Sequence, residues 1–275
     1  MDRAARLAST VRGTVLFVGA SDTGKTTLAQ AVLAELESKG RAVAYLDCDL
    51  GQTTVGPPTT MGVRWRGPDG QPETHLYFVG DTSPRRHFLP VIVGASTLLE
   101  IAHNAGNDTV LVDTSGLVDP AAGGVALKLW KSEALRADYF VALQREDELR
   151  PILNGVRRRL RGRLIVLDPG PDVRRRERRE RTDYRRERWA QYFAHARQVS
   201  LRLAHLDVWG GYRLEPSRLV GLDDAQGLCL GLGVLMEAQG GAIRVLTPVE
   251  DVDAAVRLRL GSLLLDPDWR ETRYP

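Results

Sequence analysis

The segment Gly19–Thr26 constrains this chain more than any other, because it reads Gly-Ala-Ser-Asp-Thr-Gly-Lys-Thr and fits the pattern G-x-x-x-x-G-K-[ST]. The apolar run Val15–Val18 comes directly before it. After it, apolar residues at helical spacing predict a helix over Thr27–Lys39 that ends at Gly40. A strand, a glycine loop and a helix in this order point backbone amides into one concavity at the positive end of a helix dipole. The pattern therefore predicts a phosphate-binding loop and, with it, nucleotide binding.

The residue types of this loop suggest a role for each position. Gly19 and Gly24 permit backbone angles and close approaches that a β-carbon would block. Lys25, as a loop lysine, is expected to be exposed to ligand and to reach the β- and γ-phosphates, and Thr26 is expected to ligate Mg²⁺. The predicted nucleotide-binding residues are Gly19, Ser21, Asp22, Thr23, Gly24, Lys25, Thr26 and Thr27. The alternative is an ordinary strand-to-helix turn that contains Gly-Lys-Thr by accident.

Two further predicted strands end in carboxylates. The apolar run Ala42–Leu46 leads into Asp47 and Asp49, which share one face of a strand because side chains alternate. The run Thr109–Val112 ends in Asp113, which is the Walker B pattern and predicts a residue that holds Mg²⁺ through water. Open α/β sheets place ligands at the carboxyl ends of their strands. A helix-capping or turn-forming aspartate pair is the alternative at the first of these positions.

The order of the remaining elements indicates the fold. The sequence predicts a hairpin of Met61–Arg66 with Thr74–Val79, a helix running through Leu99 to Ile101, helices at about Gly123–Leu135 and Glu146–Arg161, and strands at Tyr139–Leu143 and Leu164–Leu167. This alternation predicts an α/β P-loop fold with a mostly parallel, doubly wound sheet over residues 1–198. Short apolar runs separated by glycine turns predict a small β-rich domain over residues 199–275.

The basic residues are mostly arginine. The net charge is +3, and all but four of the 38 basic residues are Arg, which suits bidentate phosphate recognition. Codon usage explains the overall count equally well, so only local clusters carry weight. One cluster is Arg85-Arg86, which opens an apolar helix. The other is the stretch of about 172–195, which reads either as a solvated helix laced with ion pairs or as a mobile lid.

The two cysteines and the apolar runs bear on the compartment. Cys48 and Cys229 show no metal-ligand spacing and cannot form a framework of bridges, which favours a reducing cytoplasm. No apolar run is long enough to span a bilayer, so no membrane association is expected.

Together these motifs resemble the polynucleotide 5′-hydroxyl kinases related to the kinase subunit of the eukaryotic cleavage-and-polyadenylation machinery and to ribosomal-RNA-processing kinases. The resemblance rests on Gly19–Thr26, the Asp-x-Asp-x-Gly-Gln pattern at Asp47–Gln52, Phe78–Pro84, Thr114–Gly116, the arginine-rich lid with Tyr192-Phe193, and the tail at Gly221-Leu222, Gly231–Gly233 and Leu246–Pro248. It covers most of the chain. The family often has tryptophan directly after the glycine of the third motif, whereas this chain has Leu117.

The resemblance implies transfer of the γ-phosphate of ATP, with Mg²⁺ as cofactor, to the 5′-hydroxyl end of RNA or DNA. Single-stranded ends are expected, because a 5′ end must thread into a pocket. The implied catalytic residues are Lys25, Asp47 as general base, and Arg185 and Arg188 as candidates for a phosphoryl-contacting arginine. The implied substrate-binding residues are Asp49, Gln52, Thr82, Arg85, Arg86, Thr114, Ser115 and Gly116. We expect a minimal prokaryotic form with no obligate protein partner.

Two other classes of function remain open at this stage. The first is a non-catalytic ATP-binding assembly or RNA-processing factor that holds nucleotide as a structural clamp, for which Asp47 would be dispensable. The second is a GTPase or ATPase switch. A guanine-reading Asn-Lys-x-Asp segment would indicate it, and the sequence has none.

Overall fold

The computed structural model describes residues 3–160, 162–170, 173–174, 176–211 and 213–274, which form two compact units. The first unit comprises Met1–Asp49, Met61–Thr74 and Pro84–Glu177, and the second comprises Leu50–Thr60, His75–Ser83 and Arg178–Pro275. The predicted helix end at Arg161, the predicted lid start at Asp172, and Arg175 lie outside the described residues. The contacts assign residues 178–198 to the second unit. The domain boundary at residue 198 stays a prediction.

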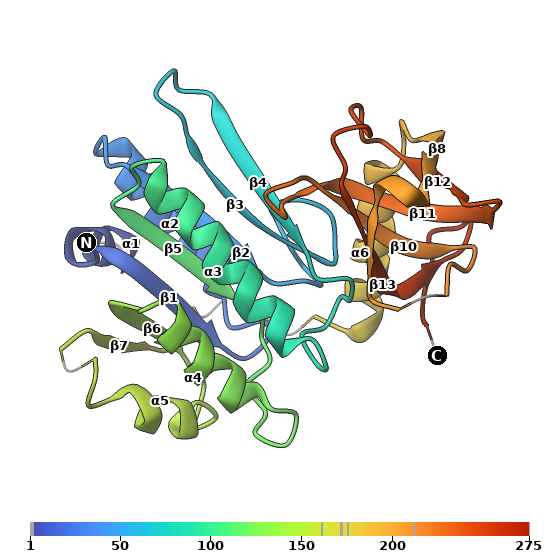
Figure 1. The fold of residues 1–275 in the computed structure, drawn as a ribbon. Helices are drawn as coiled ribbons and strands as arrows, with labels where there is room; N and C mark the ends of the chain where they lie inside the picture. Colours follow the sequence, from blue (N-terminus) through green and yellow to red (C-terminus); the bar gives the residue numbers. More distant parts are fainter. Residues whose placement is uncertain (1–2, 161, 171–172, 175, 212, 275) are drawn as a thin grey trace. The chain divides into compact units, whose positions relative to one another are not determined.

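A seven-stranded sheet forms the centre of the first unit (Figure 1). Its strands are β1 (Gly13–Gly19), β2 (Val43–Cys48), β3 (Thr60–Arg66), β4 (Pro72–Phe78), β5 (Thr109–Thr114), β6 (Tyr139–Leu143) and β7 (Leu164–Leu167), in the order β4-β3-β2-β5-β1-β6-β7. Five neighbouring strands run parallel to one another, namely β2, β5, β1, β6 and β7, and β3 is antiparallel to β2. The predicted α/β fold with a mostly parallel sheet is therefore confirmed.

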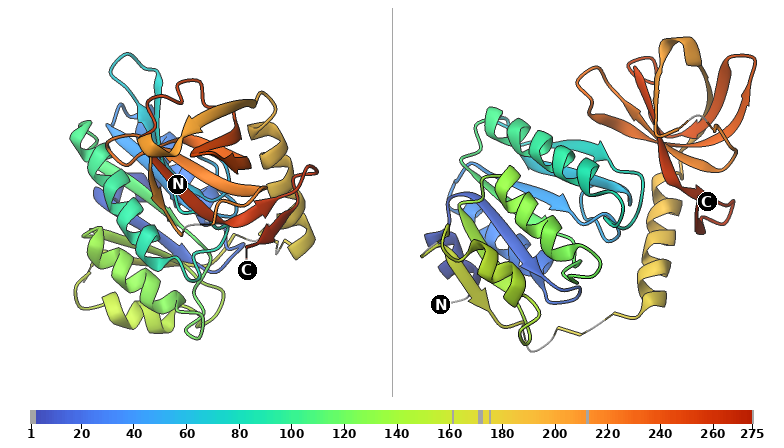
Figure 2. Two further views of the ribbon diagram at one scale, coloured as in Figure 1. Left: turned by 45° about the vertical axis from the view of Figure 1, so that its right-hand side comes forward. Right: turned by 60° about the horizontal axis from the view of Figure 1, so that its bottom comes forward.

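Helices cover both faces of this sheet. They are α1 (Arg3–Thr10), α2 (Lys25–Ser38), α3 (Phe88–Asn104), α4 (Gly124–Ala134) and α5 (Arg150–Val156). Helices α1 and α2 pack together on one face, and α3, α4 and α5 lie side by side on the other (Figures 1 and 2). Within the residues that the structure describes, no helix is both long enough and apolar enough to cross a bilayer.

Two helices differ from the prediction. Helix α1 was not predicted, although Ala4, Leu7 and Ala8 bury one face of it. Helix α5 begins at Arg150 instead of near Glu146, because the Glu148 carboxylate accepts the amides of Arg145 and Glu146 and holds them in a turn. Proline at the first turn of α5 is compatible with a helix start there.

The second unit is a mostly antiparallel sheet, which confirms the predicted β-rich region. Its strands are β8 (Arg197–Arg202), β9 (Asp207–Trp209), β10 (Arg218–Asp223), β11 (Cys229–Gln239), β12 (Ala242–Thr247), β13 (Arg257–Leu265) and β14 (Glu271–Arg273), with a short 3₁₀ turn at Leu203–His205. The order is β14-β13-β10-β11-β12-β8, and β9 pairs in parallel with β13.

Helix α6 (Arg178–Tyr192) carries the predicted arginine-rich segment and packs on this second sheet. Trp189 is fully buried, and Phe193 just after the helix is stacked on Trp269 with ring centroids 4.9 Å apart. The Tyr192 hydroxyl accepts the amide of Leu232 at 2.7 Å, and burial raises its pKa. One face of α6 is therefore buried on the sheet, and only the other face is solvated. The frequent arginines of this segment gave no indication of the buried face in the sequence.

Candidate active site

The glycine loop closes on itself at the carboxyl end of β1. Gly24 is the N-cap of α2 with φ of 86°, a left-handed conformation that favours glycine. The hydroxyl of Thr23 donates to Ala20 O at 3.0 Å, and the Lys25 ammonium donates to the same oxygen at 2.7 Å. The first turn of α2 thus follows the loop directly, as a phosphate cradle requires.

Lys25 differs from the expectation of an exposed loop lysine. It is the first residue of α2 and only 6% exposed, because its side chain folds back over the loop onto Ala20. Burial lowers its pKa, and the neighbouring Asp113 acts most strongly in the opposite direction. The ammonium is therefore held within the loop, close to where the bound phosphates of a P-loop protein lie.

We predict that Lys25→Ala lowers phosphoryl transfer by about 10²–10³-fold while the protein stays folded, since one preorganised charge donor is lost. The variant should melt close to the wild type, because a buried ammonium costs desolvation energy that alanine does not. The matched control is Lys39→Ala at the other end of α2, where the lysine is half exposed and pairs with Glu35 at 3.7 Å. Initial rates with saturating ATP check the prediction, and near-wild-type transfer by Lys25→Ala would contradict the role.

Asp113 at the end of β5 forms the polar centre beside the loop. Its Oδ2 accepts the Thr26 hydroxyl at 2.5 Å and the Tyr45 hydroxyl at 3.2 Å. Its Oδ1 is buried and has no hydrogen-bond partner among the residues described. Burial raises the Asp113 pKa, against the lowering effects of Lys25 and of the Thr26 hydrogen bond.

This donor set fits Mg²⁺. A hydroxyl and a carboxylate with one unsatisfied oxygen are hard oxygen ligands, and Mg²⁺ in nucleotide sites binds one or two such groups together with phosphates and waters. Within the described residues, no group of three or more His, Cys, Asp or Glu side chains could hold a metal without such help.

Asp47 lies directly beside Asp113 in the sheet. The parallel register pairs Asp47 with Asp113 and Cys48 with Thr114, so the two aspartates share one face and Cys48 points to the other. Asp47 is 1% exposed, and its Oδ1 accepts the amide of Asp49 at 2.9 Å. Asp49 lies just beyond the strand and is half-buried. The carboxylate of Asp47 therefore also forms the turn that the alternative interpretation expected.

The loop Thr114–Gly116 packs against the glycine loop. Thr114 is fully buried and donates to Phe17 O at 2.8 Å, so its hydroxyl is engaged with β1. A β-carbon on Gly116 would come within 2.3 Å of the Ser21 hydroxyl and 2.5 Å of the Ser21 amide nitrogen. Only glycine permits this approach. Ser115, also buried, is held between these two contacts.

Two arginines outside the predicted nucleotide-binding set fix Asp22 of the glycine loop. Arg145 donates to Asp22 O at 2.6 Å, and the amide and Nε of Arg176 donate to the Asp22 carboxylate at 3.1 and 3.2 Å. The position of Arg145 just after β6, at the same edge of the sheet, was the available signal. Arg176 gave no such signal, because it is one of many arginines.

The remaining predicted residues divide between the units. Arg85 and Arg86 are exposed in the first unit, in the loop before α3. Gln52 and Thr82 are half-buried in the second unit. Next to Thr82, Asp81 accepts the amide of Ser83 at 2.8 Å, which fixes the turn that carries the threonine.

Arg185 and Arg188 lie on α6 and have partners within the second unit. Arg185 pairs with Glu271, with Nε 2.9 Å from Oε1, and both side chains are 16% exposed. Arg188 donates to Gly56 O at 2.7 Å. The hydroxyl of Tyr184 donates to Thr53 O in the same loop. Their predicted role at the transferring phosphoryl group stays a prediction.

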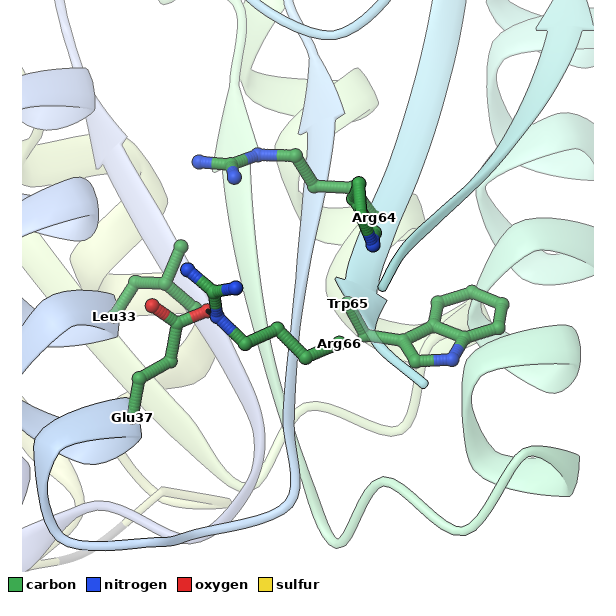
Figure 3. Close-up of a pocket in the computed structure, with 6 residues that line it drawn as sticks. Leu33, Glu37, Arg64, Trp65 and Arg66 are labelled. Atoms are coloured by element: carbon green, nitrogen blue, oxygen red, sulfur yellow. Dashed lines mark ion pairs between the residues drawn. The ribbon is translucent and has the colours of Figure 1, made fainter. Parts of the chain in front are cut away.

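A pocket of the first unit lies away from these groups. It has a volume of about 160 Å³ and is lined by Leu33 and Glu37 of α2 and by Arg64–Arg66 and Pro72 of the hairpin (Figure 3). Glu37 pairs with Arg66 at 3.7 Å. Because these α2 residues lie in its second half, the pocket is remote from the glycine loop and is not part of the candidate site.

The glycine loop at the end of β1, the lysine folded over it and the hydroxyl–carboxylate pair of Thr26 and Asp113 define a P-loop nucleotide-binding protein. The family model described as mRNA cleavage and polyadenylation factor CLP1 P-loop matches residues 19–195. The chain belongs to this family.

Two relatives support membership of this family, and a solved structure supports the fold. A protein of Pyrococcus abyssi named polyribonucleotide 5′-hydroxyl-kinase is 31% identical, over 94% of this chain and 89% of its own length. One of Pyrococcus furiosus with the same name is 30% identical, over 94% and 89%. A structure described as wild-type Clp1p-Pcf11p (454–563) complex superposes with a TM-score of 0.73 at 13% identity, over 94% of this chain and 76% of that one, and supports the fold alone.

Proposed function

We propose that this chain is an ATP-dependent polynucleotide 5′-hydroxyl kinase that transfers the γ-phosphate of ATP to the 5′-hydroxyl end of RNA. The observation that carries the proposal is the parallel register that sets the buried Asp47 at the end of β2 beside Asp113 at the end of β5, the strand that pairs with the P-loop strand β1. A nucleotide clamp needs the loop but not a second buried carboxylate. The names of the archaeal relatives support the substrate.

Each residue of the site has a task in this reaction. Lys25 contacts the β- and γ-phosphates and stabilises the charge that develops on them. Asp47 accepts the proton of the attacking 5′-hydroxyl. Thr26 and Asp113 hold Mg²⁺, which when bound offsets the charge of the triphosphate. Asp47 lies within β2, and the amide of Asp49 fixes its carboxylate at the carboxyl end of the strand.

The other predicted residues are proposed to hold the polynucleotide. Ser115 and Gly116 lie against the P-loop, where the end of the substrate must meet the phosphate. Arg85 and Arg86 contact backbone phosphates without reading bases. Asp49, Gln52, Thr82 and Thr114 complete the proposed substrate-binding set, in which the buried Thr114 acts through the loop it fixes. DNA ends are a second proposed substrate.

The experiment that tests the function is incubation of the purified protein with γ-labelled ATP, Mg²⁺ and matched 5′-hydroxyl oligonucleotides of RNA and DNA. We expect label on the RNA 5′ end and none on an oligonucleotide that already carries a 5′ phosphate. Omission of Mg²⁺ should abolish transfer. ATP binding without transfer to either oligonucleotide would favour the clamp.

A further inference from the structure

Two lysines of α4 are buried in the interior of the first unit. Lys128 and Lys131 are both 0% exposed and are three residues apart, so they share the helix face that packs on the sheet. Lysine is almost never fully buried unless it is paired. Neither forms an ion pair with a carboxylate among the residues that the structure describes. Two such side chains in one helix need a physical explanation.

Lys128 makes its hydrogen bonds with the loop that precedes the helix. Its ammonium donates to Ser115 O at 2.5 Å and lies 3.3 Å from Ser115 Oγ. Burial lowers the Lys128 pKa well below its ordinary value, and the nearby charges of Lys131 and Lys25 lower it further. Lys128 is thus within electrostatic reach of the P-loop lysine.

Lys131 has no hydrogen-bond partner for its ammonium within the described part of the chain. It also acts on the buried Cys48 thiol at the end of β2: burial raises the pKa of Cys48, and Lys131 lowers it in part. Lys131 therefore matches Lys128 in helix, burial and residue type but does not hold the loop.

Two consecutive residues, Ser115 and Gly116, link Lys128 to the P-loop. Ser115 is followed by Gly116, whose backbone lies on Ser21 with no room for a β-carbon. Thr114 on the other side is fixed to β1 through Phe17 O. Ser115 is the middle residue of this loop, and the Lys128 ammonium is the charged group that holds it.

Stability alone does not account for a lysine at this position. A buried ammonium carries a desolvation penalty, and replacing buried charged groups with apolar ones of similar volume is often neutral or stabilising. Methionine has nearly the length of lysine and would fill the same space. What methionine lacks is the directed hydrogen bond to Ser115 and the positive charge.

We propose that Lys128 is a positioning residue that holds the loop Thr114–Gly116 against the P-loop and so sets the place of the 5′-hydroxyl end of the polynucleotide. This rests on the proposed kinase function. Lys128 is fully buried, and it acts through Ser115. Its effect should therefore fall on the polynucleotide and not on ATP.

The test compares Lys128→Met with Lys131→Met in the full chain. For Lys128→Met we expect a melting temperature at or above that of the wild type, a KM for ATP within about twofold, and kcat/KM for a 5′-hydroxyl RNA lowered by about 10–100-fold, the range expected for a charged hydrogen bond. Lys131→Met should retain kcat/KM within about threefold. Lys128→Gln, which can still donate to Ser115 O, should recover part of the loss.

Amide hydrogen exchange of residues 114–117 gives a readout that does not depend on activity. Exchange should be faster in Lys128→Met than in the wild type and unchanged in Lys131→Met. Unchanged exchange in Lys128→Met overturns the positioning role, even if the wild-type protein transfers no phosphate and the proposed function fails. Wild-type kinetics of Lys128→Met, or equal losses for ATP and RNA with a lower melting temperature, also overturn it.

Discussion

Alanine at Arg185 or at Arg188 is expected to lower kcat by about 10³–10⁵-fold, with ATP binding weakened much less. An arginine that contacts the transferring phosphoryl group in cis is worth that much in related phosphoryl-transfer enzymes. Single-turnover transfer to RNA and equilibrium binding of ATP, measured on the same preparations, check the prediction. It requires that at least one of the two variants shows the large loss.

The partners of these arginines supply the controls. Arg185 pairs with Glu271, so Glu271→Gln breaks the ion pair but leaves the arginine in place and should retain activity if Arg185 acts on the phosphoryl group. Equal losses in Arg185→Ala and Glu271→Gln would instead assign Arg185 to the stability of the second unit. Arg179→Ala removes an exposed pair with Asp183 on the same helix and should change nothing. Full activity of every α6 variant would leave the helix without a catalytic role.

Asp47→Asn is expected to lower kcat by about 10²–10⁴-fold and to leave ATP affinity within a few fold, because a general base acts on the hydroxyl proton and not on the nucleotide. Asparagine retains an oxygen that can accept the amide of Asp49, so the turn after β2 should survive. The loss would then report the missing base and not a disturbed backbone. Steady-state transfer to RNA and ATP binding measure the two quantities separately.

A suitable control is Asp108→Asn, just before β5 at the opposite end of the same sheet, where the carboxylate pairs with Arg41 at 3.3 Å. It should be as active as the wild type. If Asp47→Asn were also fully active, the carboxylate would serve the fold alone. That outcome would favour a nucleotide clamp over a kinase.

Local chemistry let the sequence predict the P-loop and its neighbours. Gly24 is left-handed where the motif needs glycine, and Thr26 contacts the aspartate that the Walker B pattern singled out. Asp47 and Asp113 were each predicted at the carboxyl end of a strand, and the register sets them side by side. Each of these predictions rests on a motif of a few consecutive residues, which can be identified from the sequence alone.

Contacts between distant segments were beyond the sequence. Lys25 was expected to be exposed, but its side chain folds back over its own loop. The partner of Arg185 is Glu271, 86 residues away, and nothing in the alternation of arginine and glutamate on α6 indicates it. Trp189 was not recognised as a core residue because the arginines around it dominate the helix pattern.

The sequence by itself determined the fold class, the nucleotide loop and the likeness to a kinase family, since these follow from periodicity and from motifs whose residues act on their near neighbours. Only the tertiary structure decided which arginines anchor Asp22, that Ser115 is held by Lys128, and that two lysines of α4 are buried. A buried lysine looks like a surface lysine in a sequence, because its burial is set by the sheet that the whole chain builds beneath it.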